Sequence, residues 1–417
     1  MSCMKNPQDI VVTGIGTITP IGLNLNEFWK NLIRGVSGAD YIRGFDTDGF
    51  RSKIACEVKG FTAGDFMDKR SARKMTRFSQ LAVCASMEAV KDSGINLESI
   101  NPLRAGCIMG SAAGDYEVLE KQFATLAERG PGRGNPLAVP KIIPNMAAGN
   151  VAIELGIHGP NMAVLSACAT GTHTIGMAMQ ILQLGQADVM IAGGTESTIT
   201  ALVVDAYGCM KVLTARNDDP KAASRPFDLD RDGFVIGEGS ASLILERRED
   251  AEKRGARIYA VLGGLGMSAD ASSIAAPDEN GKWAGEAIKM AIQNAGLNPE
   301  DIGYVNAHGT STQANDKTET RAIHTVFGSR GKSIPVSSNK SMIGHTLGAA
   351  GAIEAAATIM SLHTGILPPT INQEQPDPNC ELDTIPNQAR ELKIRAAVTN
   401  SFGFGGQNAC LAFIAED

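Results

Sequence analysis

The chain has 417 residues, enough for two domains or for one large α/β unit with two halves. Its formal net charge of −7 gives no overall basicity that would favour nucleic acid or an anionic membrane, so an acidic partner would need a local basic patch. The 8 cysteines and 6 histidines show no CxxC pair and no zinc-ligand spacing, and no run of about 18 apolar residues occurs. Since the N-terminus also lacks the features of a signal peptide, we expect a soluble protein of the cytoplasm, or of an organellar matrix after import.

The first part of the chain predicts a buried strand at residues 9–16, where an apolar run ends in glycines, and a helix at residues 25–34 after the cap residue Asn24. Residues 130–144 are rich in proline and glycine and predict a surface loop. A basic run at residues 66–77 leads into a predicted helix at residues 78–93, and in an acidic protein this run is the best landing place for an acidic partner. Its basic residues are Lys69, Arg70, Arg73, Lys74 and Arg77, and the later loop carries Arg129 and Arg133.

Two distant segments, residues 89–100 and 291–302, align without gaps. Each resembles the end of a helix with a glycine at the C-cap position, and each is followed by a strand-like run. The repeat is far longer than a solenoid period, so it predicts two related α/β halves, 1–256 and 257–417. Strands alternate with helices throughout, which predicts mainly parallel sheets covered on both faces.

The stretch 162–194 predicts a strand at 162–165, a tight turn, a helix to about Leu184 and a second strand at 189–192. Cys168 lies where the helix begins. There a thiol faces unpaired backbone N–H groups and the positive end of the helix dipole, which favour the thiolate and can stabilise a neighbouring oxyanion. Cys168 is therefore the candidate nucleophile, although a lone cysteine is more often a packing residue.

The second half should contain the matching unit, and residues 334–363 fit it, with a strand at 334–337 and a helix from near His345. Further strands are predicted at 240–246, 258–262, 396–400 and 410–414, with a helix at 247–255. Four glycine-rich turns then place reactive or hydrogen-bonding groups after strands. They surround Cys168, His308, the pair Lys340 and His345, and Phe404. A thiol and two imidazoles that converge from separate loops would form a nucleophile with two proton carriers or hydrogen-bond donors.

These motifs, SACATG, NAHGTST, NKSMIGHTLGAAGAIEA and NSFGFGG, resemble those of the beta-ketoacyl-acyl carrier protein synthases, most closely the type II members. The resemblance covers nearly the whole chain in the order of the family. It implies a thiolase-like α/β fold of two pseudo-repeated halves in a layered α-β-α-β-α architecture, and a homodimer. It also implies a decarboxylative condensation of an acyl thioester with malonyl-acyl carrier protein, with acyl carrier protein as partner and no required cofactor.

The same resemblance implies roles for particular residues. Cys168 would be acylated, and the N–H groups of Cys168 and Phe404 would form its oxyanion hole. His308 and His345 would stabilise the charge left by decarboxylation, and Lys340 would hold charge and orientation beside them. The residues implied for the remaining roles are Phe404 as gate, Thr310 and Thr312 for the pantetheine arm, Ala113 at the end of the acyl pocket, the seven basic residues above for carrier docking, and Asn306, Glu354 and Asn400 for a structural monovalent cation, Na⁺ or K⁺.

Four other interpretations are weighed against single residues or remain open. A degradative thiolase would have a second cysteine where this chain has His345, and an initiating synthase would pair its cysteine with one histidine and an asparagine. A non-catalytic chain-length partner would lack the nucleophile, whereas this chain has Cys168. A polyketide-type condensing subunit has the same motifs, and Ala113 is smaller than the residue often found there, so neither pathway nor chain length follows from the sequence.

Overall fold

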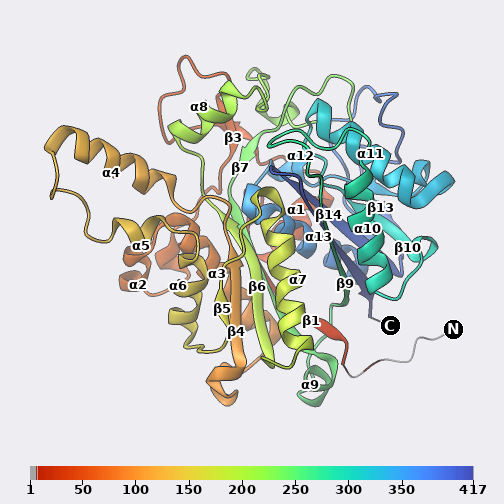
Figure 1. Cartoon of the computed structure of the whole chain (residues 1–417), viewed down its shortest axis with the longest axis horizontal. Helices are drawn as coiled ribbons and strands as arrows, with labels where there is room; N and C mark the ends of the chain where they lie inside the picture. Colours follow the sequence, from red (N-terminus) through yellow and green to blue (C-terminus); the bar gives the residue numbers. More distant parts are fainter. Residues whose placement is uncertain (1–5, 7, 417) are drawn as a thin grey trace.

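The computed structural model describes residue 6 and residues 8–416 (Figure 1). Cys3 lies outside the described residues, as does part of the N-terminal segment in which we predicted no signal peptide. Within the described part, ten strands form one sheet in the order β11-β10-β14-β15-β9-β1-β8-β6-β4-β5. The first-half strands are β1 (Ile10–Ile18), β4 (Ala105–Gly110), β5 (Asn161–Met162), β6 (Val189–Glu196) and β8 (Gly239–Arg247). The second-half strands are β9 (Ala260–Ala269), β10 (Ile302–Asn306), β11 (Val336–Ser337), β14 (Ala396–Gly403) and β15 (Gln407–Ala415).

The sheet consists of two groups of five strands that meet where β1 pairs with β9, through Val11 with Val261 and Val12 with Ala260. Our prediction of mainly parallel sheets is wrong. β14 and β15 are joined by a short turn and are antiparallel, and β8 and β1 also run antiparallel to their neighbours. In this ten-stranded sheet, parallel pairing is confined to β4 with β5 and β6, and to β10 with β11 and β14. Of these antiparallel pairs, only β14 and β15 are joined by a short turn, and long segments of chain separate the two strands of each other pair.

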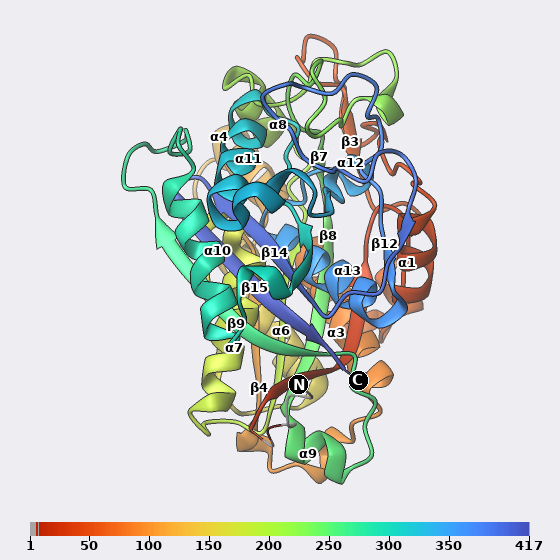
Figure 2. The same cartoon turned by 90° about the vertical axis from the view of Figure 1, so that its right-hand side faces the viewer.

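The helices complete five layers (Figures 1 and 2). Helices α7 (Thr170–Gln183) and α13 (Ala350–Thr364) lie in the middle and each contacts strands of both groups. Helices α3 (Arg77–Ser93) and α6 (Met146–Leu155) cover the first group from outside, and α10 (Lys282–Asn294) and α11 (Gln313–Phe327) flank the second. The other helices are α1 (Leu25–Ile33), α2 (Lys69–Lys74), α4 (Tyr116–Arg129), α5 (Ala138–Ile142), α8 (Ala201–Cys209), α9 (Arg248–Lys253) and α12 (Lys340–Ile343). This is the layered arrangement expected for a thiolase-like fold.

The two halves repeat local packing as well as topology. Glycine lets a strand touch its covering helix in both halves: a Cβ at Gly16 of β1 would lie 2.0 Å from Ala85 O, and one at Gly266 of β9 would lie 1.9 Å from Ala287 O. The aligned segments both end their helices with a left-handed glycine, Gly94 at φ 64° and Gly296 at φ 67°. The predicted cap of α1 is also present, since Asn24 Oδ1 accepts the N–H of Glu27.

Several elements differ from the sequence prediction, and the strand expected at 258–262 is the longer β9, Ala260–Ala269. The strand expected at 162–165 is only Asn161–Met162, because β5 is a short exposed edge strand and the chain then turns toward Cys168. The loop expected at 130–144 contains the short helix α5. The strand at 334–337 is only Val336–Ser337, and the helix expected from near His345 begins at Ala350, after the turn Leu347–Ala349. Small pairs complete the fold: β2 (Asp40–Tyr41) with β3 (Ile54–Cys56) and β7 (Ile236–Gly237), and β12 (Ile366–Leu367) with β13 (Arg390–Glu391).

No helix in the described residues has the length and apolar character needed to cross a membrane.

Candidate active site

Cys168 lies in the 3₁₀ turn Ala167–Ala169 that leads into α7. The turn forces Ala167 into a left-handed backbone conformation, φ 49°, which is strained for a residue with a Cβ. Hydrogen bonds hold it there: Thr170 Oγ1 accepts the N–H of Ser166, and Ser166 Oγ lies 2.6 Å from His173 Nδ1. His173 therefore supports this turn.

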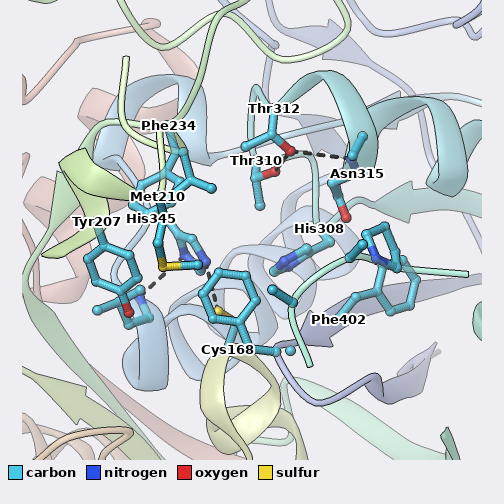
Figure 3. Close-up of a pocket in the computed structure, with 18 of the residues that line it drawn as sticks. Cys168, Tyr207, Met210, Phe234, His308, Thr310, Thr312, Asn315, His345 and Phe402 are labelled. Atoms are coloured by element: carbon cyan, nitrogen blue, oxygen red, sulfur yellow. Dashed lines mark hydrogen bonds between the residues drawn. The ribbon is translucent and has the colours of Figure 1, made fainter. Parts of the chain in front are cut away.

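His345 contacts the thiol directly, with Nε2 3.1 Å from Cys168 Sγ. The N–H of Leu347 donates to His345 Nδ1 over 3.3 Å, so in the neutral ring the proton is on Nε2. Nε2–H therefore points at sulfur and at any group bound to it. Figure 3 shows this contact at the floor of the cavity, with His308 beside it.

His308 is oriented in a similar way from the other side. Lys340 Nζ lies 3.4 Å from His308 Nδ1 and forms a buried ion pair with Glu354, so Nδ1 is the acceptor and Nε2 of the neutral ring carries the proton. The two imidazole rings meet edge to face, with centroids 5.4 Å apart. The backbone N–H groups of His308 and Gly309 both donate to Glu319, which fixes the loop that carries His308.

Burial controls the protonation of all three groups. It lowers the pKa of His308 and of His345 well below the usual value, with a further contribution from Lys340, so both rings are neutral donors. Burial also raises the pKa of the Cys168 thiol to about 12, although Lys340 and the N–H of Phe404 act in the opposite direction. Burial of the thiol therefore opposes the thiolate that the helix N-terminus is predicted to favour.

Two cavities meet at Cys168. One, of about 320 Å³, is lined by the predicted residues Thr310 and Thr312 together with His308 and His345. The other, of about 240 Å³, is lined by Ala112 and Ala113. The residues common to both cavities are Cys168, Tyr207, Leu347 and Phe404. Phe404 occupies the turn between β14 and β15 at this junction, where a swing of its ring would change the connection between the cavities.

The seven predicted docking residues are not equivalent. Lys69, Arg70, Arg73 and Lys74 lie on α2, and Lys74 shares a small cavity with Lys141 of α5, a basic residue that sequence analysis did not select. Arg77 instead forms a bidentate pair with Glu238 and also donates to Val58 O, so its charge is directed into the fold. Arg129 ends α4, and Arg133 is exposed in the loop that follows.

The residues predicted to bind a cation share an unusual property. Asn306 Oδ1, Glu354 Oε2 and Asn400 Oδ1 are all buried without a hydrogen-bond partner, and Thr399 Oγ1 beside Asn400 is too. The amide nitrogens of the two asparagines already have partners: Asn306 Nδ2 donates to the backbone oxygen of Glu354, and Asn400 Nδ2 donates to the Glu319 carboxylate. Oxygen atoms of this kind suit a hard cation. The described residues hold no cluster of three His, Cys, Asp or Glu side chains that could bind a metal.

Sequence reasoning missed two buried carboxylates. Glu319 on α11 holds the His308 loop, and Glu196 at the end of β6 accepts the N–H groups of Ala112 and Gly348 and the hydroxyl of Ser111. Glu196 thereby joins the wall of the second cavity to the turn before α13. Neither residue lies in a glycine-rich turn, and no local pattern distinguishes it from a surface carboxylate.

Comparisons with known proteins agree with this architecture. Residues 7–251 match the beta-ketoacyl synthase N-terminal domain, and residues 259–374 match the beta-ketoacyl synthase C-terminal domain. The chain is 48% identical to 3-oxoacyl-acyl-carrier-protein synthase 2 of Synechocystis sp., over 97% of each chain. It is 44% identical to the protein of the same name from Staphylococcus aureus, over 98% of this chain and 99% of that one.

Solved structures show the same fold. A ketosynthase of type II polyketide synthesis, solved with its acyl-carrier protein and bound to a hexaketide, superposes with a TM-score of 0.92 at 33% identity, over 99% of this chain and 100% of that one. The ishigamide ketosynthase/chain length factor gives 0.92 at 34% identity, over 98% and 100%. The expected thiolase-like fold is thus confirmed, and the chain belongs to the beta-ketoacyl synthase family.

Proposed function

We propose that this protein is a 3-oxoacyl-acyl carrier protein synthase that extends an acyl chain by decarboxylative condensation with malonyl-acyl carrier protein. One observation carries the proposal: a buried thiol and two neutral Nε2–H donors converge where two cavities meet. The near-complete coverage of relatives named 3-oxoacyl-acyl-carrier-protein synthase 2 supports it. The larger cavity takes the pantetheine arm, and the smaller one takes the acyl chain.

In the first step Cys168 attacks the carbonyl carbon of the acyl thioester. A new carbon–sulfur bond forms at Cys168, the bond to the carrier sulfur breaks, and the Cys168 proton passes to the departing thiolate. Because the pKa of Cys168 is about 12, this proton is present at neutral pH and must leave as the attack proceeds. The N–H groups of Cys168 and Phe404 stabilise the oxyanion, and one such donor is typically worth about 3 kcal/mol.

In the second step malonyl-acyl carrier protein occupies the larger cavity. Its carboxylate leaves as CO₂, and the electron pair of that bond forms an enolate whose oxygen receives hydrogen bonds from His308 and His345. The enolate carbon then attacks the acyl group on Cys168, which gives the 3-oxoacyl product and releases the Cys168 sulfur as a thiolate that takes up a proton from solvent. Neutral imidazoles suit this step because each keeps its Nε2 proton and uses it in a hydrogen bond to the enolate oxygen. Lys340 holds His308 in the required tautomer.

The remaining residues bind and orient the substrates. Thr310 and Thr312 hydroxyls, 2.9 Å apart, face the larger cavity and bind the pantetheine arm. Phe404 gates the acyl cavity, and Ala113 limits its depth. Asn306, Glu354 and Asn400 hold a structural Na⁺ or K⁺ through their unpartnered oxygens, which steadies the Lys340–Glu354 pair and requires no part in the chemistry.

Acyl carrier protein docks on the basic residues of α2 and of the 129–133 region. Arg77 does not contact the carrier protein directly, and its ion pair with Glu238 supports the docking surface from within the fold. A second copy of this chain covers the edge strand β5 and the exposed Leu165, which follows β5 closely in the chain. The division into halves 1–256 and 257–417 is supported by the two family matches. The seven described cysteines are free thiols, which fits a cytoplasmic protein.

Intact-mass and peptide mapping after incubation with acyl-acyl carrier protein tests the proposal. We expect one acyl group on Cys168, followed by its loss and the appearance of 3-oxoacyl-acyl carrier protein when malonyl-acyl carrier protein is added. Modification at another residue, or an acyl-enzyme that never condenses, would overturn it. A protein that binds carrier without acylation would instead be a non-catalytic partner subunit.

A further inference from the structure

Glu196 is a fully buried residue at the end of β6 whose carboxyl group holds two loops of the site at once. Its Oε2 accepts the N–H of Ala112 at 2.8 Å and the N–H of Gly348 at 3.0 Å. Its Oε1 accepts the hydroxyl of Ser111 at 2.9 Å. Because Ala112 lines the smaller cavity, one side chain ties the wall of that cavity to the turn before α13.

The turn that Glu196 holds is strained, and it fixes the ring of His345. Leu347, which begins the turn, has a left-handed backbone conformation, φ 48°, that is costly for a residue with a Cβ. The N–H of Leu347 donates to His345 Nδ1. The N–H of the next residue, Gly348, donates to Glu196. Without that acceptor the turn can relax toward an ordinary helical backbone, which would move the Leu347 N–H away from His345.

Glu196 acts in this arrangement through its oxygen atoms and not through its charge. Burial raises the pKa of Glu196 to about 7, and the groups that oppose this rise, the N–H of Ala112 foremost, are hydrogen-bond donors. Near neutral pH many molecules therefore carry a neutral carboxyl group, whose carbonyl oxygen still accepts N–H groups. A glutamine at this position keeps an oxygen acceptor at the same distance from the backbone, whereas an aspartate keeps the carboxyl group on a side chain one methylene shorter.

We infer that Glu196 is a positioning residue, which holds the turn before α13 so that the neutral ring of His345 keeps its proton on Nε2, facing Cys168. A neutral imidazole has one ring proton, and the nitrogen that accepts a hydrogen bond leaves that proton on the other nitrogen. If Nδ1 loses its donor, the proton can move to Nδ1, and Nε2 then presents a lone pair to the enolate oxygen instead of a hydrogen-bond donor. This inference rests on the proposed function, in which His345 donates to the enolate.

The test is the rate of CO₂ release from malonyl-acyl carrier protein by full-length variants. Glu196→Asp draws the acceptor back from the turn and should lower the rate by about 10- to 10³-fold, up to the loss expected for one missing oxyanion donor. Glu196→Gln keeps the acceptor and should stay within about threefold of the parent protein. A Glu196→Asp rate equal to that of the parent, or a Glu196→Gln rate as low as that of Glu196→Asp, would overturn the inference.

The matched control is Glu246→Asp. Glu246 is also buried, and it lies opposite Val189 at the other end of the β6–β8 pair, where it forms an ion pair with Arg254. The same shortening there should leave the rate of CO₂ release unchanged. An equal loss in Glu246→Asp and Glu196→Asp would show a general effect of shortening a buried carboxylate and would overturn the inference.

A double-mutant cycle separates an effect through His345 from a merely structural one. In the His345→Ala background, Glu196→Asp should lower CO₂ release by about twofold or less, because the ring that it positions is already absent. In the His308→Ala background, Glu196→Asp should keep its full effect. Equal losses in the two backgrounds would overturn the inference. A parent protein that releases no CO₂ from malonyl-acyl carrier protein would instead remove the proposed function itself, and this inference with it.

Discussion

The turn before α7 and the turn before α13 have matching backbones and different side chains. Both are 3₁₀ turns that begin at a residue in the left-handed region, Ala167 at φ 49° and Leu347 at φ 48°. The next residue is Cys168 in the first half and Gly348 in the second. A Cβ at Gly348 would lie 2.4 Å from Ala112 N, so the second turn is pressed against the first half and has no room for a side chain.

This difference divides the chemistry between the halves. The first turn presents a thiol to both cavities, whereas the second turn uses its N–H groups to hold neighbours: Leu347 donates to His345, and Gly348 donates to Glu196. The other donor, His308, and its partner Lys340 also belong to the second half. Acylation should therefore depend on the first turn, and enolate stabilisation on the second half, so that mutation can separate them.

The largest expected effect comes from Cys168→Ala. Loss of the group proposed to carry the acyl chain should reduce condensation by at least about 10⁴-fold, comparable to removal of other covalent nucleophiles. Decarboxylation of malonyl-acyl carrier protein should persist, because both Nε2–H donors remain. Release of CO₂ and formation of 3-oxoacyl product are measured in the same reaction. Parallel loss of both activities would show that the halves are not chemically separable.

The converse change is His308→Ala. One donor to the enolate disappears, and decarboxylation should fall by about 10²- to 10³-fold. Acylation of Cys168 should fall much less, because His345 and not His308 contacts the sulfur. Rates of acylation and of CO₂ release separate the two steps, and His363→Ala on the same half, away from both cavities, is the control. An equal loss in both rates would contradict the division.

The protonation state of Cys168 gives a third test of the difference between the turn before α7 and the turn before α13. Since burial places its pKa at about 12, the thiolate fraction should rise about tenfold per pH unit below that value. Alkylation of Cys168 by iodoacetamide should thus accelerate about 100-fold between pH 7 and 9, without a plateau. Peptide mapping distinguishes Cys168 from the exposed Cys209. A rate that is already flat in this range would indicate a stable thiolate, as the sequence alone had predicted.

The thiolate prediction illustrates what the sequence can and cannot specify. The position of Cys168 at a helix N-terminus follows from local pattern, as do the repeated helix ends at Gly94 and Gly296. The raised pKa of Cys168 depends on burial against residues such as His345, 177 positions away in the chain, which no local pattern encodes.

The same limit explains the other discrepancies. The inward pairing of Arg77 depends on Glu238, and the role of Glu196 depends on Gly348, so each is set by a distant partner. Antiparallel β8 and β15 were missed because strand patterns specify burial and not direction. The site residues were found through family motifs. Tyr207, which lines both cavities, was not found, because it belongs to none of these motifs.

The smallest effect, on stability, tests why the second turn has a glycine. Gly348→Ala places a methyl group against Ala112 N and 2.7 Å from Glu196 Oε2, both in tightly held surroundings, and overpacking of this kind typically costs about 1–3 kcal/mol. Gly44→Ala is the control, because a Cβ there meets nothing within 4 Å. Urea unfolding compares the two variants with the parent protein. If Gly348→Ala is as stable as Gly44→Ala, the turns are not held together by close backbone contact, and the glycine in place of a cysteine at position 348 needs another physical cause.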